Sequence, residues 1–187
     1  MYKKQVLASI DKRVLGGVAH RGLHSKDVSE NSLEAFRRAI EKDSAIEFDV
    51  HLTTDNELVV IHDEDLKRLT GKEGVVEYLS SKELRENYRL LDGQVIPTLE
   101  EVLDLVDERV PMFIELKVYE KNYKPLAKRF REFIEPRIKD KSKYILISFD
   151  PRSLLPLKSM GLVRLLLVAN LMNTSITLLD SISMEWI

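Results

Sequence analysis

Cysteine is absent from all 187 residues of the sequence. Disulfide bonds, thiolate catalysis and cysteine-based metal sites are therefore excluded. A large excess of either charge is lacking too, because 29 lysines and arginines face 31 aspartates and glutamates, for a net charge of -2. This balance implies no basic face, which argues against nucleic acid as the main partner. The composition, 44% hydrophobic and 32% charged, is typical of a soluble globular domain.

Long hydrophobic runs are also lacking. Residues 1–17 contain scattered apolar side chains but no continuous apolar run, so we expect no secretory signal. The most apolar stretch, residues 161–171, includes Arg164 and is shorter than the roughly 20 residues that a membrane-spanning helix needs. We therefore interpret this stretch as a buried strand and expect a cytoplasmic protein without a membrane span.

Short apolar runs alternate along the chain with segments of helical periodicity. The sequence predicts strands at residues 14–20, 45–50, 58–61, 112–116, 144–148 and 162–168. It predicts helices from Ser29 or Asn31 through Ile40, and at residues 81–87, 98–108, 124–138 (interrupted by Pro136) and 153–160. This alternation indicates a parallel α/β scaffold. Residues 63–95 are rich in charge and lack sustained periodicity, and we interpret them as an excursion from that scaffold.

Two carboxylates lie two residues apart in the strand predicted at residues 45–50. Because side chains alternate along a strand, Glu47 and Asp49 point to the same face. Two such charges repel each other and lose hydration when buried, unless a cation neutralises them. Carboxylate oxygens suit a hard ion such as Mg2+ or Ca2+. The alternative is a partly exposed strand with solvated acids, and these two residues alone favour neither interpretation.

Polar side chains follow or end four of the predicted strands. In a parallel β/α barrel, the carboxyl ends of all strands meet at one rim, where such enzymes place their active sites. We therefore expect the following groups to converge there: His20-Arg21, Glu47 with Asp49, His62-Asp63, and Glu115 with Lys117.

The converging groups combine anionic ligands with fixed positive charge. Glu47, Asp49 and Glu115 would supply three oxygen ligands to one divalent ion. Arg21 offers a planar guanidinium that grips phosphate oxygens, and Lys117 adds a second cation. Together with a pair of histidines, this set is typical of phosphoryl-ester cleavage.

The histidines differ in what the sequence implies for them. His20 and His62 are the two groups of the converging set that can give and take protons near neutral pH. His24 lies in the loop after the first strand, where substrate contact is one interpretation. His51 shares the face of the two carboxylates but falls where the strand ends, so we interpret it either as a support for the residues of the site or as structural. Asp63 either positions His62 or caps the next segment, and the sequence does not decide between these.

Seven short motifs together resemble one known family. In chain order they are His20-Arg21-Gly22, Glu30-Asn31-Ser32, Glu47-Phe48-Asp49-Val50, His62-Asp63, Pro97-Thr98-Leu99-Glu100-Glu101-Val102-Leu103, Glu115-Leu116-Lys117 and Ser148-Phe149-Asp150. This series resembles the glycerophosphodiester phosphodiesterase family, and the resemblance extends over residues 18–168. Several separated motifs in the right order are more specific than any one of them.

The resemblance implies a fold and a cofactor. The fold would be a TIM (β/α)8-type barrel in a single domain, residues 1–187, with a small insertion at about residues 63–96, after the second strand. Glu47, Asp49 and Glu115 would bind one divalent cation, Mg2+ or Ca2+. Glu30 would either bind that metal or support its ligands.

The resemblance also implies a reaction. His20 and His62 would act as general acid and base, while Arg21, Lys117 and Asn31 would bind or orient the substrate phosphate. A hydroxyl of the substrate's own glycerol would attack phosphorus and expel the head-group alcohol. Water would then open the cyclic phosphate to glycerol 3-phosphate. The expected partner is thus a small-molecule glycerophosphodiester; the alternative substrates are a lysophospholipid or a phosphoinositide.

The end of the sequence departs from the family pattern. A closed (β/α)8 barrel typically needs about 250 residues, whereas five or six barrel strands can be counted here. Trp186 is the only tryptophan, and its neighbours do not match the Trp-Thr motif of the family's late strands. We therefore predict an incomplete barrel, whose open edges favour self-association. A remnant that binds a phosphodiester or a protein partner without turnover is a further alternative.

Overall fold

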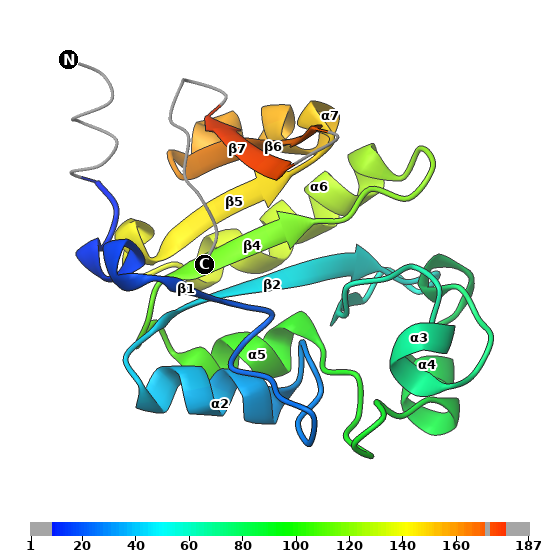
Figure 1. The fold of residues 1–187 in the computed structure, drawn as a ribbon. Helices are drawn as coiled ribbons and strands as arrows, with labels where there is room; N and C mark the ends of the chain where they lie inside the picture. The colour runs from blue at the N-terminus through cyan, green and yellow to red at the C-terminus, as the bar shows by residue number, and fades with distance from the viewer. Residues whose placement is uncertain (1–8, 171–172, 179–187) are drawn as a thin grey trace.

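The computed structural model describes residues 9–170 and 173–178, which form a curved sheet with helices packed along it (Figure 1). Five strands run parallel, and in spatial order they are β1 (Val18–His20), β2 (Ala45–Leu52), β4 (Met112–Leu116), β5 (Tyr144–Ser148) and β6 (Val163–Asn170). Two more strands pair antiparallel: β3 (Leu58–Val60) with β2, and β7 (Asn173–Leu178) with β6. The predicted parallel α/β scaffold is therefore confirmed.

Helices connect the parallel strands. The α-helices are α2 (Leu33–Glu41), α3 (Lys67–Thr70), α4 (Ser81–Asn87), α5 (Leu99–Val106), α6 (Tyr123–Ile134) and α7 (Pro151–Leu154). The 3-10 helices are η1 (Lys12–Gly16), η2 (Val76–Tyr78), η3 (Glu135–Arg137), η4 (Lys141–Lys143) and η5 (Leu155–Met160). None of the helices in the described ranges is long and apolar enough to cross a membrane.

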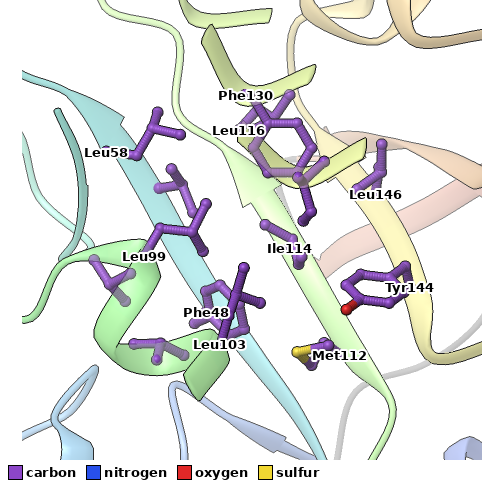
Figure 2. Close-up of a cluster of buried hydrophobic side chains, with 14 of the residues drawn as sticks. Phe48, Leu58, Leu99, Leu103, Met112, Ile114, Leu116, Phe130, Tyr144 and Leu146 are labelled. Atoms are coloured by element: carbon purple, nitrogen blue, oxygen red, sulfur yellow. The ribbon is translucent and has the colours of Figure 1, made fainter. Parts of the chain in front are cut away.

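The larger core lies between one face of the sheet and helices α2, α5, α6 and α7. Alternate residues of β2 and β4, such as Phe48 and Ile114, point to this face and are fully buried (Figure 2). The ring of Phe48 meets that of Phe36 from α2 edge to face, with centroids 5.6 Å apart. Burying such rings contributes on the order of 2–3 kcal/mol each, so this layer holds the strands in place.

A smaller core covers the opposite face of the sheet. Phe113, Ile145 and Leu165 point to this side and pack with Ile10 and with Val14 of η1. Glu47, Asp49 and Glu115 point to this same face of the sheet as the smaller core. Along this face, apolar residues at one end of the sheet are therefore followed by carboxylates at the other.

Two predicted elements have different limits from those expected. Residues 14–20 do not form one strand, since Asp11 caps η1 by accepting a hydrogen bond from Arg13 N, and β1 begins only at Val18. Helix α6 ends at Ile134 rather than continuing through residue 138, and Pro136 lies in η3. Proline lacks the N–H that would continue the helix, which explains the early end.

The prediction that residues 58–61 add another parallel strand is wrong. β3 runs antiparallel to β2, with His51 opposite Val59. Residues 53–57 alone connect the two strands, and this is far fewer than the dozen or so residues that a parallel crossover requires. Thr53 N donates to Glu57 O across the turn, which closes a hairpin.

The expected insertion after the second strand is present. Between β3 and α5 the chain forms α3, η2 and α4. Their apolar side chains make a separate cluster with β3, made up of Val59, Ile61, Leu66, Leu69, Val76, Leu84, Leu90 and Ile96. The insertion therefore has its own packing and stands beside one end of the sheet (Figure 1).

Glycine substitution should destabilise the protein more at Gly22, in the loop between β1 and α2, than at Gly93. Gly22 has a φ of +80°, and a Cβ there would lie 2.8 Å from Ala35 Cβ, whereas Gly93 has a φ of +87° with nothing within 4 Å. We expect Gly93→Ala to lower the free energy of unfolding by about 1–2 kcal/mol through left-handed strain alone. Gly22→Ala adds a clash and should cost about 1–3 kcal/mol more. Urea denaturation measures both, and equal losses would contradict the close packing of this loop on α2.

Candidate active site

Three buried carboxylates converge at one end of the sheet. Glu47 and Asp49 belong to β2, and Glu115 of β4 lies opposite Asp49 in the parallel register. One oxygen from each lies within 4.8 Å of the others, and the three residues are 1%, 0% and 6% exposed. The alternative of a partly exposed strand with solvated acids is therefore wrong, and the expected convergence of these three is confirmed.

Burial makes ionisation of this cluster unfavourable. Desolvation, followed by the charges of Asp49 and Glu115, raises the pKa of Glu47 well above its ordinary value. Desolvation likewise raises the pKa of Glu115 to about 7, although Lys117 opposes this. Asp49 Oδ1 accepts no hydrogen bond from the described residues. Three such oxygens fit a divalent cation, which would replace mutual repulsion with attraction.

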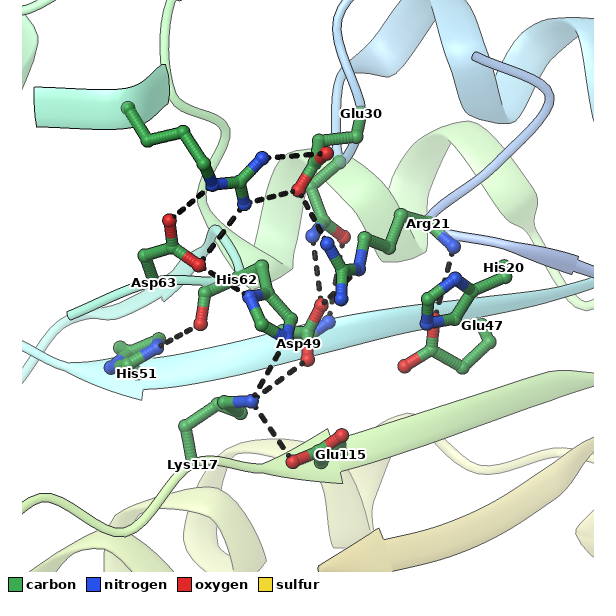
Figure 3. Close-up of polar contacts among 12 residues, drawn as sticks. His20, Arg21, Glu30, Glu47, Asp49, His51, His62, Asp63, Glu115 and Lys117 are labelled. Carbon is green, nitrogen blue, oxygen red and sulfur yellow. Dashed lines mark hydrogen bonds and ion pairs between the residues drawn. The ribbon is translucent and has the colours of Figure 1, made fainter. Parts of the chain in front are cut away.

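Arg21 extends over the carboxylate cluster from the loop after β1 (Figure 3). Its backbone N donates to Glu47 Oε2 at 3.0 Å, and Nη1 donates to Glu30 Oε1 at 2.8 Å. Its Nε is buried without a hydrogen-bond partner among the described residues, 3.8 Å from Asp49 Oδ2. The guanidinium thus holds one unused donor toward the cluster.

The loop that carries Arg21 is under backbone strain. Arg21 and Asn31 have φ values of +57° and +53°, in the left-handed region that non-glycine residues rarely adopt. Asn31 N donates to Arg21 O at 2.9 Å, and Asn31 Nδ2 donates to Asp49 Oδ2 at 2.9 Å. These bonds hold the strained residues against the carboxylates, so Asn31 orients a proposed metal ligand.

His62 is held by a carboxylate on one side and a cation on the other. Its Nδ1 lies 2.5 Å from Asp63 Oδ1, and its Nε2 lies 3.3 Å from Lys117 Nζ. A carboxylate accepts and an ammonium donates, so the proton of neutral His62 is on Nδ1 and the lone pair is on Nε2. Burial, with the charge of Lys117, lowers the pKa of His62. Of the two alternatives for Asp63, the structure therefore supports the positioning of His62.

The hairpin explains how His62 reaches the site despite the antiparallel direction of β3. β2 continues beyond Asp49 to Leu52, and the returning chain places Ile61 N 3.1 Å from Asp49 O. The residue after Ile61 is therefore at the level of the carboxylates. The expected position of His62 is correct, although the expected reason for it is not.

His20 and Lys117 complete the site. His20 Nε2 lies 3.8 Å from Glu47 Oε2, and burial together with Arg21 lowers the pKa of His20. In Figure 3, His20 and His62 lie on opposite sides of Arg21. Lys117 Nζ lies 3.1 Å from Glu115 Oε1 and 3.5 Å from Asp49 Oδ1. Although burial opposes it, these two carboxylates raise the pKa of Lys117.

Four further residues form a network around the site. Glu30, expected to bind the metal or to support its ligands, lies outside the three-carboxylate cluster and pairs with Arg21 and Arg68. His51, interpreted as a support for the site or as structural, places Nδ1 2.5 Å from Glu77 Oε1 and Nε2 3.1 Å from His62 O. Arg68 and Glu77 come from the insertion and were not expected here, because no local pattern links them to residues so distant in sequence.

His24 does not join the central group. It lines a cavity of about 560 Å³ between the loop after β1 and the insertion, together with Glu30 and Arg68. His24 could contact substrate only through this cavity, and substrate contact by His24 stays a prediction.

Comparison with known proteins identifies the family. The model of the glycerophosphoryl diester phosphodiesterase family matches residues 20–173, a range that includes every residue named in the candidate site. The chain belongs to this family. The resemblance that the sequence motifs carry is thereby confirmed.

Similarity to individual proteins agrees with this assignment. A glycerophosphodiester phosphodiesterase from Caldanaerobacter subterraneus subsp. tengcongensis is 38% identical over 161 residues, covering 77% of this chain and 62% of that protein. The crystal structure of a glycerophosphodiester phosphodiesterase from Thermotoga maritima is 37% identical, with a TM-score of 0.63, and the match covers 79% of this chain and 59% of that one. The chain thus spans about three fifths of the length of these relatives.

A second structure bears on the fold alone. A phosphodiesterase from Oleispira antarctica, solved in complex with sn-glycerol-3-phosphate, is 24% identical, with a TM-score of 0.70, and the match covers 79% of this chain and 63% of that one. Together with the Thermotoga structure, it confirms the TIM-barrel type of the fold. The described residues contribute five of the eight parallel strands that a closed barrel requires.

The raised pKa of Glu115 predicts how stability depends on pH in EDTA. The folded chain holds this proton up to about pH 7, whereas the unfolded chain releases it near 4.5. Stability is therefore lost as pH rises through this window, and Glu115→Gln should remove that loss. We expect the unfolding free energy of Glu115→Gln, relative to the wild-type protein, to rise by about 2 kcal/mol between pH 5 and pH 8.

Urea denaturation at each pH measures this difference. Glu132→Gln, on the exposed side of α6, is the matched control and should follow the wild-type protein at every pH. A constant difference between Glu115→Gln and the wild-type protein would contradict a burial-raised pKa.

Proposed function

We propose that this chain catalyses the metal-dependent hydrolysis of small-molecule glycerophosphodiesters to glycerol 3-phosphate and an alcohol. The observation that carries the proposal is the buried cluster of Glu47, Asp49 and Glu115, faced by Arg21 and flanked by two histidines. Membership of the family and the names of the relatives support the same reaction.

The phosphate group of the substrate would bind above the carboxylates. Arg21 Nε is a buried donor without a partner in the described part of the chain, and a phosphate oxygen would satisfy it. Glu47, Asp49 and Glu115 would hold one divalent cation, Mg2+ or Ca2+. When bound, the cation supplies charge neutralisation at a phosphate oxygen and lowers the pKa of the attacking hydroxyl. Asn31 fixes the Asp49 carboxylate that serves as ligand.

The two histidines would transfer the protons. One imidazole takes the proton of the glycerol hydroxyl as that oxygen attacks phosphorus, and the other gives a proton to the departing alcohol oxygen. In the second step the roles reverse: a water molecule loses its proton, and its oxygen opens the cyclic phosphate to glycerol 3-phosphate. His62 suits these roles because Asp63 fixes its tautomer and leaves the Nε2 lone pair toward Lys117 and the site.

Association between copies of the chain is part of the proposal. β1 and β7 are the end strands of the described sheet, and each pairs with a neighbour on one side. Unpaired strand edges favour pairing with another chain.

Release of glycerol 3-phosphate from glycerophosphocholine tests the proposed function. We expect release with Mg2+ or Ca2+, and its loss in EDTA. His20→Ala and His62→Ala should each lower kcat by about 100- to 10,000-fold, the usual contribution of a general acid or base. Lysophosphatidylcholine in parallel reactions separates soluble from lipid substrates.

The histidine variants need a control for the integrity of the metal site. Calorimetric titration with Mg2+ should give similar affinities for His62→Ala and the wild-type protein, because His62 lies outside the carboxylate cluster. A folded wild-type chain that releases no product with either metal would contradict the proposal. Full activity in His62→Ala would contradict the assigned role.

A further inference from the structure

Arg68, on α3 of the insertion, joins two carboxylates that belong to different parts of the chain. Its Nε and Nη2 lie 2.5 Å and 3.0 Å from Asp63 Oδ2 and Oδ1. Its Nη1 and Nη2 lie 3.1 Å and 2.9 Å from Glu30 Oε2 and Oε1. The guanidinium therefore makes two-point contacts with both carboxylates at once.

Each of these carboxylates holds a residue of the proposed active site. Asp63 accepts from His62 Nδ1, and Glu30 accepts from Arg21 Nη1 (Figure 3). Arg68 thus stands one contact behind the proton-transferring histidine and one contact behind the phosphate-binding arginine. The other side-chain partners are separate residues, since His62 bonds to Asp63 and Arg21 bonds to Glu30, whereas Arg68 bonds to both carboxylates.

We propose that Arg68 is a positioning residue, which sets the placement of His62 through Asp63 and that of Arg21 through Glu30. The assignment rests on the proposed function, since it gives His62 and Arg21 their tasks. It also assigns a role to the insertion, namely to supply the group that links the two sides of the site.

The contacts explain why arginine is required at this position. A guanidinium is planar and presents five donors in a fixed fork, which allows paired bonds to two carboxylates. A lysine ammonium carries the same charge but lacks this geometry, so it can bind one carboxylate well or two poorly. Four of the five N–H donors of Arg68 are directed at Asp63 and Glu30, so these two carboxylates are its main partners.

Arg68 favours the ionised form of the two carboxylates. Although burial opposes ionisation, Arg68 and then Arg21 bring the pKa of Glu30 down to about 2. The Arg68 guanidinium is likewise the main cause that holds the pKa of Asp63 below its usual range. Both carboxylates are thus anionic at neutral pH and able to accept from His62 and Arg21.

A merely structural role for Arg68 makes a different prediction. Its side chain is 50% exposed, and exposed ion pairs contribute little to stability. If Arg68 only tied the insertion to the loop after β1, its loss would change stability slightly and leave the catalytic constants unchanged. Positioning instead requires losses in turnover and in substrate binding while the fold is kept.

Steady-state kinetics on Arg68→Ala and Arg68→Lys test the proposal. We expect a 10- to 100-fold loss of kcat/KM in both, the range typical of residues that orient a ligand or catalytic group. Misplacement of His62, which transfers protons, should lower kcat. Misplacement of Arg21, which binds the phosphate, should raise KM. Arg85→Ala is the matched control, because Arg85 lies on α4 of the same insertion, is 48% exposed and pairs with Glu101.

Chemical rescue separates geometry from charge. Arg68 lines the cavity of about 560 Å³ beside the site, so a small cation can enter the space that Arg68→Ala leaves. Methylguanidine at millimolar concentration should restore part of the lost kcat/KM with saturation, and methylamine should not. Equal rescue by both cations, or full activity of Arg68→Lys, would overturn the argument from the guanidinium fork.

A readout without substrate keeps this proposal separate from the proposed function. Nitrogen-15 chemical shifts of the His62 ring report which nitrogen carries the proton in the metal-free chain. We expect Nδ1–H in the wild-type protein and in Arg85→Ala, and a mixture of tautomers in Arg68→Ala. An unchanged His62 spectrum with unchanged kcat/KM in Arg68→Ala would overturn the proposal, whereas an inactive wild-type chain would overturn only the function.

Discussion

The repulsion among three buried carboxylates is the constraint on which the rest of the site depends. Glu47, Asp49 and Glu115 lie on the face of the sheet that elsewhere carries apolar side chains. Charges of one sign in such a place are costly unless cations face them. Lys117, the residue after β4, provides part of that charge, and Arg21 provides another part from the loop after β1. A divalent ion at the cluster would complete the neutralisation.

The surrounding structure fixes the positions of the residues around the carboxylates. Arg21 and Asn31 adopt left-handed backbone conformations, and Gly22 between them packs too closely on α2 for any side chain. The insertion adds two supports, Glu77 behind His51 and Arg68 behind Glu30. Strain and charge concentrate in these segments because the strands beneath them are fixed by two apolar cores.

The sequence predicted the central residues because their signals are local. Alternation along β2 places Glu47 and Asp49 on one face, and short polar motifs mark where β1 and β4 end. The antiparallel direction of β3 was missed, although the short link at residues 53–57 permits a hairpin. Arg68 could not be found from sequence, since its contacts with Glu30 span 38 positions and depend on how the insertion folds back.

Calorimetric titration of the purified chain with Mg2+ and with Ca2+ tests the central claim most directly. The account predicts saturable binding of one ion, weakened at least tenfold in Asp49→Asn. Because burial raises the pKa of Glu47 and Glu115, binding should also release protons, seen as a heat that changes with the ionisation enthalpy of the buffer. A folded wild-type chain that binds neither ion, or an Asp49→Asn variant that binds equally well, would contradict the account.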